Sequence, residues 1–272
     1  MRTGVMTYID NSGAGLSPGL WKDCPIDEIN GNNNNGYGFF DDFNDIAYTV
    51  PTTEANFGRY RGFSSTGGVL ANMATELGGV LTLGSDGDNE GSSIGQVGFP
   101  YKISLSNKSL WFECRVKSST ISDTKHGILV GLVGATAITT TRSVLTAIEP
   151  IAADGTIVDT NFVGFHRLEG DGDYFNTVYK ADGVTQVTVK DNAKVIVADT
   201  YVKLGMYWNY FTGILTFYAD GVALPDTYTM ASGAGTDFPN DVTLGLVMAV
   251  LNATGTTPGN AYIDWWACYQ LR

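Results

Sequence analysis

The C-terminal part of the chain, residues 200–272, constrains the fold most, because its apolar residues recur at every second position. Apolar and polar side chains alternate along TYVKLGMYWN at 200–209, and the runs ILTFYA at 214–219 and AYIDWWACYQLR at 261–272 follow. Asp220–Gly221 makes a tight turn after the second run, because glycine adopts positive φ without a Cβ clash. Period-two apolarity between Gly, Asn and Asp residues indicates antiparallel sheet packed on one face.

The same alternation occurs near the middle of the chain, in LWFECRVK at 110–117. Phe112, Cys114 and Val116 share one face of the expected strand, and we predict that this face is buried. Glu113 lies on the opposite face and has no acidic partner at the neighbouring same-face positions. We interpret it as a solvated strand residue.

These patterns predict an all-β domain over residues 38–272, built as two packed antiparallel sheets. We expect helix only in a short piece near 141–149, ended by Pro150. The composition agrees, because 34 glycines and only 16% charged residues are typical of a β-protein with many turns. A sandwich of roughly 200–250 residues is commonly one domain.

Charge and hydropathy exclude several classes of partner. The net charge of −12 argues against nucleic acid and against an anionic membrane surface, which both need clustered Lys and Arg. The longest apolar run, Leu244–Leu251, is far shorter than the roughly 20 residues of a membrane helix. The N-terminal sequence is too polar for a signal peptide, and Cys24, Cys114 and Cys268 form no CxxC pair. We therefore expect a chain made in a reducing cytosol.

Residues 1–37 form a distinct segment, rich in Gly and Asn, in which no strand or helix period persists. We predict an extended N-terminal arm there. The arm nevertheless contains apolar residues that a flexible linker lacks, and these are Leu20, Trp21, Cys24, Pro25 and Ile26. Such residues predict docking, either onto the arm's own domain or onto a neighbouring protein, and we assign them as the binding residues of the arm.

Catalytic motifs are missing from the sequence. His126 and His166 have no metal-ligand spacing, and we interpret them as a turn and a strand histidine. There is no nucleophile elbow and no phosphate loop. None of the seven glutamates belongs to an ExDxxxE arrangement, which would supply the carboxylate pair of a glycosidase. The sequence thus predicts a protein that is not an enzyme.

One acidic loop has ligand spacing for a hard cation. Asp86, Asp88 and Glu90 lie at i, i+2 and i+4 between glycines, and oxygen ligands so spaced can wrap Ca²⁺. The alternative interpretation is a solvated acidic turn. Calcium is the one cofactor that the sequence suggests.

Aromatic side chains offer a second kind of site, because exposed rings stack on sugars. Most rings in a chain with 12% aromatic residues must nevertheless be buried, so packing is the competing interpretation. The candidate rings for a sugar platform are Tyr207, Tyr210, Tyr218, Trp266 and Tyr269.

A series of segments follows in a fixed order from residue 16 onward. They are LSPGLWKDCPIDEI (16–29), FFDDFND (39–45), GGVLTLGSDGDNEGSSI (78–94), LWFECRVKSSTISDTKHGILVGLVG (110–134), FVGFHRLEGDG (162–172), VKLGMYWN (202–209), LTFYADG (215–221) and IDWWACYQLR (263–272). In order and spacing the series resembles tailed-bacteriophage virion proteins that have a concanavalin A-like, or laminin-G-like, jelly roll.

The resemblance implies a jelly-roll sandwich of two antiparallel sheets and a non-enzymatic structural role in the virion. Within that role a capsid decoration protein, attached through its N-terminal arm, is the leading hypothesis. Its partners would be the major capsid protein and copies of itself, as a homo-oligomer such as a trimer, on the capsid surface after synthesis in the bacterial cytoplasm. The alternative is a carbohydrate-binding fibre or tail module that contacts a surface glycan of the host. A third hypothesis is a glycoside hydrolase with an unrecognised acid pair.

Overall fold

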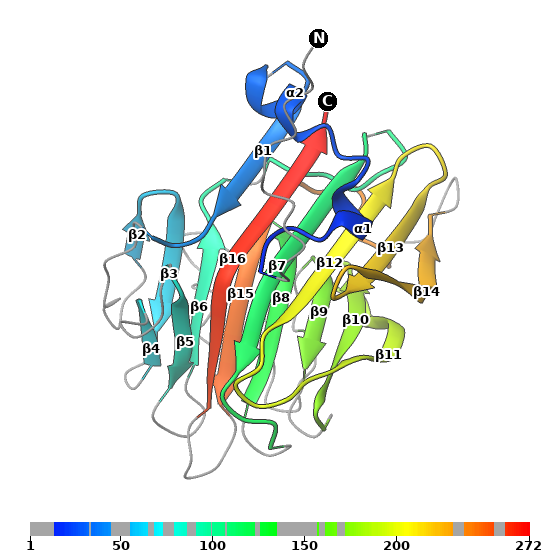
Figure 1. The fold of residues 1–272 in the computed structure, drawn as a ribbon. Helices are drawn as coiled ribbons and strands as arrows, with labels where there is room; N and C mark the ends of the chain where they lie inside the picture. The colour runs from blue at the N-terminus through cyan, green and yellow to red at the C-terminus, as the bar shows by residue number, and fades with distance from the viewer. Residues whose placement is uncertain are drawn as a thin grey trace.

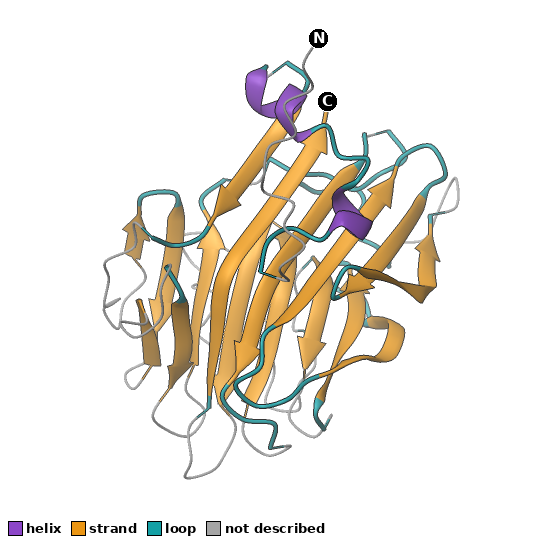
Figure 2. Ribbon diagram, in the orientation of Figure 1, coloured by secondary structure: helices purple, strands orange, loops and turns teal. Residues whose placement is uncertain are grey.

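The structure is a computed structural model, and it consists of two antiparallel β-sheets packed face to face (Figures 1 and 2). The residues that it describes are 14–32, 34–44, 55–64, 68–72, 79–85, 91–98, 100–106, 108–122, 126–134, 157, 161–167, 172–230, 237–252 and 259–272. Each sheet contains eight strands within these ranges. The predicted all-β architecture of two antiparallel sheets is confirmed.

We call the sheet that contains the C-terminal strand the front sheet. Its strands run in the order β14-β13-β12-β7-β16-β5-β4, and β1 also pairs with β16. The bounds are β1 Gly36–Asp41, β4 Gly68–Asn72, β5 Leu81–Ser85, β7 Leu110–Ser118, β12 Val202–Asn209, β13 Ile214–Ala219, β14 Val222–Thr229 and β16 Asn260–Leu271.

The second sheet, which we call the back sheet, runs in the order β11-β10-β9-β8-β15-β6-β3-β2. Its strands are β2 Ala55–Phe57, β3 Tyr60–Ser64, β6 Gly91–Gln96, β8 His126–Gly134, β9 Phe162–Arg167, β10 Tyr174–Lys180, β11 Val187–Val195 and β15 Leu244–Asn252. Several neighbours in each sheet are far apart in the sequence, as β15 between β6 and β8 illustrates.

The main core lies between the two sheets, and the alternation in the sequence correctly identifies which side chains enter it. Phe112, Cys114 and Val116 of β7 are at most 1% exposed and belong to this core. The apolar positions of β12 point the same way. Cys114 is thus the buried small hydrophobe that the sequence predicts.

Two facing glycines allow the central strands of the back sheet to approach closely. Gly131 of β8 pairs with Gly164 of β9. A Cβ on Gly131 would lie 2.4 Å from the Val163 carbonyl oxygen and 2.8 Å from the Gly164 Cα. Both neighbours are backbone atoms, so neither can move away without disturbing the strand pairing.

Gly131→Ala should therefore lower the free energy of unfolding by roughly 1–3 kcal/mol, the usual cost of overpacking. Gly31→Ala is the matched control, because a Cβ there would meet nothing within 4 Å. Urea unfolding followed by circular dichroism measures both changes. Equal stability of the two variants would contradict the steric argument.

The described part of the arm contains two short helices, α1 (Pro18–Trp21) and α2 (Ile26–Gly31), where the sequence predicts an extended segment. Pro18 starts α1 because its fixed φ suits a first helical turn. The arm's helices lie against the outer face of the front sheet and beside β1 (Figure 1). The helix predicted near 141–149 lies outside the described residues, and no described helix is long and apolar enough to cross a membrane.

Candidate functional site

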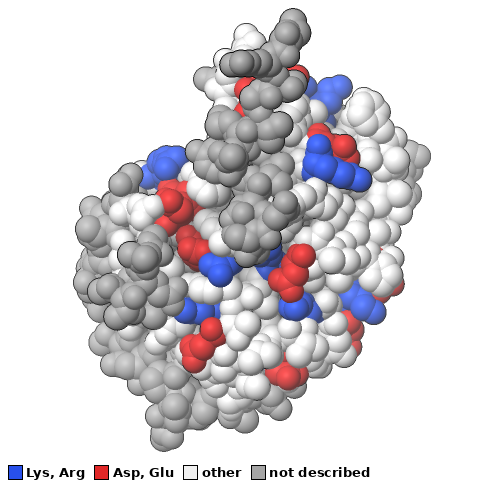
Figure 3. Space-filling model, in the orientation of Figure 1, with Lys and Arg blue, Asp and Glu red and all other residues white. Residues whose placement is uncertain are grey.

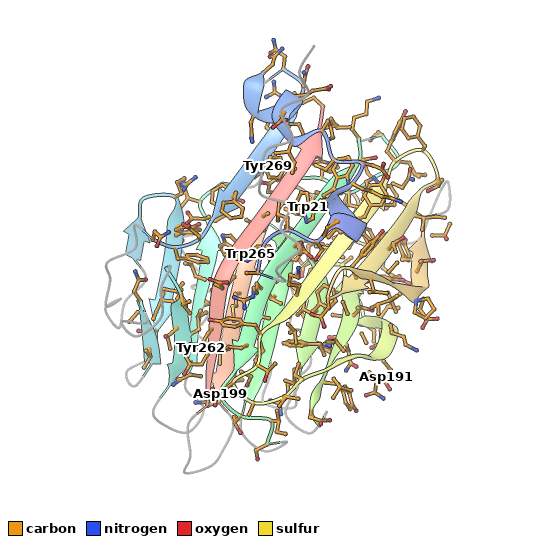
Figure 4. The ribbon with its side chains drawn as sticks, viewed as in Figure 1. Trp21, Asp191, Asp199, Tyr262, Trp265 and Tyr269 are labelled. Atoms are coloured by element: carbon orange, nitrogen blue, oxygen red, sulfur yellow. The ribbon has the colours of Figure 1, made fainter. Side chains whose placement is uncertain are left out.

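The outer face of the front sheet carries a second apolar cluster, separate from the main core and covered by the arm. Leu20 and Trp21 of α1 are 2% and 1% exposed, and they pack on aromatic side chains of the sheet. Figure 4 shows Trp21 over this face, with Trp265 and Tyr269 on β16 beside it. The Trp21 and Tyr269 rings meet edge to face, with centroids 5.7 Å apart.

Glu113 of β7 lies beneath the arm and is fully buried. Its Oε2 accepts a hydrogen bond of 2.9 Å from the Ser17 backbone N–H and one of 2.7 Å from the Trp21 Nε1–H. The interpretation of Glu113 as a solvated strand residue is therefore wrong. The two donors come from residues more than 90 positions earlier in the chain, so local sequence carried no sign of them.

Burial raises the pKa of Glu113, while the hydrogen bonds from Ser17 and Trp21 and the charge of Lys203 lower it less strongly. No second carboxylate among the described residues contributes to this shift. A nearby like charge would raise the pKa further. Within the described ranges, Glu113 therefore shows no interaction with an acidic partner of the kind that glycoside hydrolysis needs.

Two more hydrogen bonds tie the start of the described arm to the sheet. The Lys203 Nζ donates to the Gly15 carbonyl at 3.0 Å, and the Trp265 Nε1–H donates to the Ala14 carbonyl at 2.7 Å. Beneath Leu20 the sheet has Gly205, where a Cβ would lie 2.6 Å from a Leu20 methyl carbon. The sheet face is therefore shaped to receive the arm, by both its polar groups and its small residue.

The structure places the predicted arm residues on their own domain. Leu20 and Trp21 are buried there, and Cys24, Pro25 and Ile26 are half-buried. The sequence analysis missed two further anchors, Leu16 and Ile29, which belong to the same cluster. Packing of the arm on its own sandwich is one of the two outcomes that the sequence left open, and attachment to a neighbouring protein stays a prediction.

The predicted calcium ligands, Asp86, Asp88 and Glu90, lie outside the described residues, so calcium binding stays a prediction. Within the described ranges no group of three His, Cys, Asp or Glu side chains is arranged to hold a metal ion. His166 is buried in β9, and burial lowers its pKa to about 4. It is therefore neutral at pH 7, as a packed strand histidine would be.

The candidate aromatic platform is divided between several environments. Trp266 is fully buried in the main core, so its assignment as an exposed ring is wrong. A register shift between Ile263 and Trp265 interrupts the alternation of β16, turning Trp265 outward and Trp266 inward. Tyr269 is buried under the arm. The other candidates, Tyr207, Tyr210 and Tyr218, are half-buried.

Comparison with solved structures identifies the architecture. The Emp47p carbohydrate recognition domain aligns with 86% of this chain and 95% of its own at 11% identity, with a TM-score of 0.54. The endo-1,3-β-glucanase from Streptomyces sioyaensis aligns with 86% of this chain and 95% of its own at 13% identity, with a TM-score of 0.53. The fold is a concanavalin A-like jelly roll.

A third jelly roll, from work on endo-acting O-glycanases of the human gut microbiota, aligns with 86% of this chain and 99% of its own at 12% identity and a TM-score of 0.55. At these identities the likeness shows the fold alone. No protein-family model matches the sequence, and no curated protein does. The expected jelly roll is confirmed, whereas these comparisons carry no evidence for a bacteriophage virion protein.

Proposed function

We propose that the protein is a non-enzymatic structural protein of a bacteriophage virion, with capsid decoration as its role. The ordered series of sequence segments supports the virion assignment, and the jelly roll agrees with the fold that the resemblance implies. The same fold occurs in a carbohydrate recognition domain and in a glucanase, so the fold alone does not distinguish a structural role from a catalytic one. We base the choice on the carboxylates of the outer face of the front sheet.

The observation that most supports a non-enzymatic role is the complete burial of the Glu113 carboxylate. Glu113 is fully buried and accepts hydrogen bonds from the chain's own arm, so substrate has no access to it in this conformation. A second carboxylate on this face, that of Asp264 on β16, forms an ion pair with Arg115 of β7. Neither group is placed as a free acid or base, which supports a binding or structural surface.

The docked arm also suggests how the protein would meet its neighbours. Leu20 and Trp21 are engaged within the chain, whereas the half-buried Cys24, Pro25 and Ile26 remain at the surface. In this proposal they contact the major capsid protein or another copy, with the arm held as a rigid part of the domain.

A direct test of the catalytic alternative compares the wild type with Glu113→Gln. Neither protein should release reducing ends from laminarin or from mucin O-glycans above the background of a buffer control. Release by the wild type that disappears in Glu113→Gln would establish a hydrolase and refute the non-enzymatic role.

The virion role is tested by negative-stain images of virions labelled with an antibody against the protein. Label over the shell supports capsid decoration. Label on fibres or the tail supports the carbohydrate-binding alternative, and virions without label contradict a structural role.

A further inference from the structure

The turn that joins β12 to β13 carries an exposed apolar patch. Phe211 is 86% exposed, its ring centroid lies 4.9 Å from that of Tyr210, and the nearby Leu105 is 38% exposed. We call these three residues the aromatic turn. Figure 3 shows that the surface around it, at the upper right of the face, is mostly uncharged. Aromatic side chains grouped on a surface are typical of a contact with another molecule.

Hydrogen bonds hold the backbone of this turn in a defined shape. The Asn209 Oδ1 accepts hydrogen bonds from the backbone N–H groups of Phe211 and Thr212, at 3.0 and 3.3 Å. The Asn209 carbonyl accepts a third, of 2.9 Å, from the Gly213 N–H. Because the backbone is held, little conformational entropy is lost when the Phe211 ring is buried against a partner.

A cavity of about 290 Å³ lies where the arm meets β1, and we call it the arm cavity. The exposed residues Asn30 and Arg59 lie at its mouth. Three aromatic rings line it further in, those of the half-buried Phe40 and of the buried Phe39 and Tyr269. The arm cavity is thus an opening in the surface that leads to ring faces and edges.

The polar groups at the mouth have partners within the domain. The Asn30 Nδ2 donates to the Tyr269 hydroxyl at 3.4 Å, and the Arg59 Nη2 donates to the Asp41 Oδ2 at 2.9 Å. The Arg59 guanidinium carbon also lies 4.7 Å from the Phe39 ring centroid. These contacts fix the mouth in place. An uncharged aromatic group suits such a cavity, because it can meet the rings edge to face and the guanidinium across its own face.

The volume of the arm cavity favours a single side chain as its occupant. A cavity of roughly 150 Å³ in a protein core is enough to bind benzene. Pockets for larger organic ligands begin at roughly 300 Å³. At about 290 Å³ the arm cavity has room for a phenyl ring and the carbon that carries it, and it is small for anything much larger.

The aromatic turn cannot fill the cavity of its own molecule. In the front sheet β7 and β16 lie between β12 and β1. Three strand spacings place the turn roughly 14 Å from β1, which is further than a phenylalanine side chain reaches. Figure 1 shows the turn and α2 on opposite sides of β16. A Phe211 ring that enters the arm cavity must therefore come from another copy of the chain.

The charges at the two surfaces are complementary. Lys108 lies beside the aromatic turn, with its Nζ 4.6 Å from the Tyr210 ring centroid. Asp27 and Glu28 follow Ile26 in the first turn of α2, and both are exposed. The other charged residues near the two surfaces are Lys102 and Asp241 beside the turn, and Asp42, Arg272 and the Arg59–Asp41 pair beside the cavity. Positive charge is thus in excess at the turn and negative charge at the cavity, which favours their approach.

We propose that the Phe211 ring of one copy inserts into the arm cavity of the next, so that copies of the chain associate head to tail. The two contacting surfaces differ, so successive contacts either close into a ring or continue as a filament. The inference rests on the proposed function for its biological setting, and it deepens that function by naming a second copy as the partner of the surface around Ile26.

The contact is small, so association in solution is weak. Dilute protein is therefore monomeric, and the stability of the isolated chain does not depend on the contact. On a surface that already holds many copies, the high local concentration makes the same contact effective.

Sedimentation velocity on the full chain, at concentrations up to about 0.5 mM, tests the proposal. The wild type should associate reversibly, and Phe211→Ala should weaken association about tenfold or more, as loss of a central aromatic contact predicts. Val222→Ala is the matched control, because Val222 is 69% exposed on β14, away from both surfaces, and its association should equal that of the wild type. A wild type that stays monomeric, or equal association of all three proteins, would overturn the proposal.

A second pair of variants tests the cavity. Asn30→Trp places a large side chain at the mouth and should abolish association, whereas Asn34→Trp adds the same side chain at an exposed position outside the cavity and should not. Circular dichroism checks that each variant is folded. Association that is lost in Phe211→Ala but kept in Asn30→Trp would show that the rings pack on one another, and would refute insertion into the cavity.

Mixing the two inactive variants gives the sharpest outcome. Phe211→Ala keeps the cavity and Asn30→Trp keeps the ring, so the mixture should form a one-to-one dimer although each variant alone is monomeric. A mixture that stays monomeric would contradict a head-to-tail contact. Virions without label would refute the structural role and leave these results unchanged, so failure of the proposed function and failure of this contact are distinguishable.

Discussion

Replacing Trp21 with alanine should lower the free energy of unfolding by about 3–5 kcal/mol, the usual range for a buried Trp. Trp21 is 1% exposed, fills the cluster beneath the arm and donates one of the two hydrogen bonds that Glu113 accepts. The variant thus combines a cavity with a buried carboxylate that has lost a donor. Urea unfolding followed by far-ultraviolet circular dichroism measures the change.

Two control variants separate the contributions. Trp21→Phe keeps an aromatic ring but removes the Nε1–H, so its loss should fall below that of the alanine variant. Phe211→Ala removes a ring that is 86% exposed and should change stability by less than about 0.5 kcal/mol. If Trp21→Ala is as stable as Phe211→Ala, the arm does not contribute to the stability of the folded domain in solution.

The second large effect is a pH dependence of stability that originates at Glu113. Its pKa in the folded protein is raised, so folding favours the protonated carboxyl group. The stability that this group contributes is present below the pKa of an unfolded glutamate and is lost as the pH rises through the folded value. Glu113→Gln has no such titration. Relative to the wild type, the variant should therefore become more stable as the pH is raised from about 4 to 7.

Urea titrations across this pH range measure the difference in unfolding free energy between the two proteins. Phe211→Ala is the control, because it removes no ionisable group, and its difference from the wild type should stay constant. A difference for Glu113→Gln that is constant with pH, or that changes in the opposite direction, would contradict a raised pKa at this position.

Alternation in the sequence was enough to predict the sheets and most of the inward-facing residues. It identified Phe112, Cys114 and Val116 correctly, because a strand in regular register sends every second side chain to one face. It failed within β16, where the register shift exchanges the sides of Trp265 and Trp266. Adjacent tryptophans carry no signal that says which of them faces the core.

The candidate site was predictable only in part. Apolar residues in a polar arm indicated docking, and Leu20 and Trp21 are indeed buried. The surface that receives them could not be inferred, because an apolar side chain packs equally well on its own domain or on another. The burial of Glu113 was hidden for a related reason, since it depends on Ser17 and Trp21 approaching from a distant part of the chain.

The central position of β16 has a consequence for how the protein is made. Residues 260–271 pair with β7 on one side and with β5 and β1 on the other, and they contribute Trp265 and Tyr269 to the surface on which the arm lies. During translation the arm leaves the ribosome long before these residues are synthesised. Its docking surface is incomplete throughout that interval, so the front sheet and the arm reach their final arrangement only after the last strand has emerged.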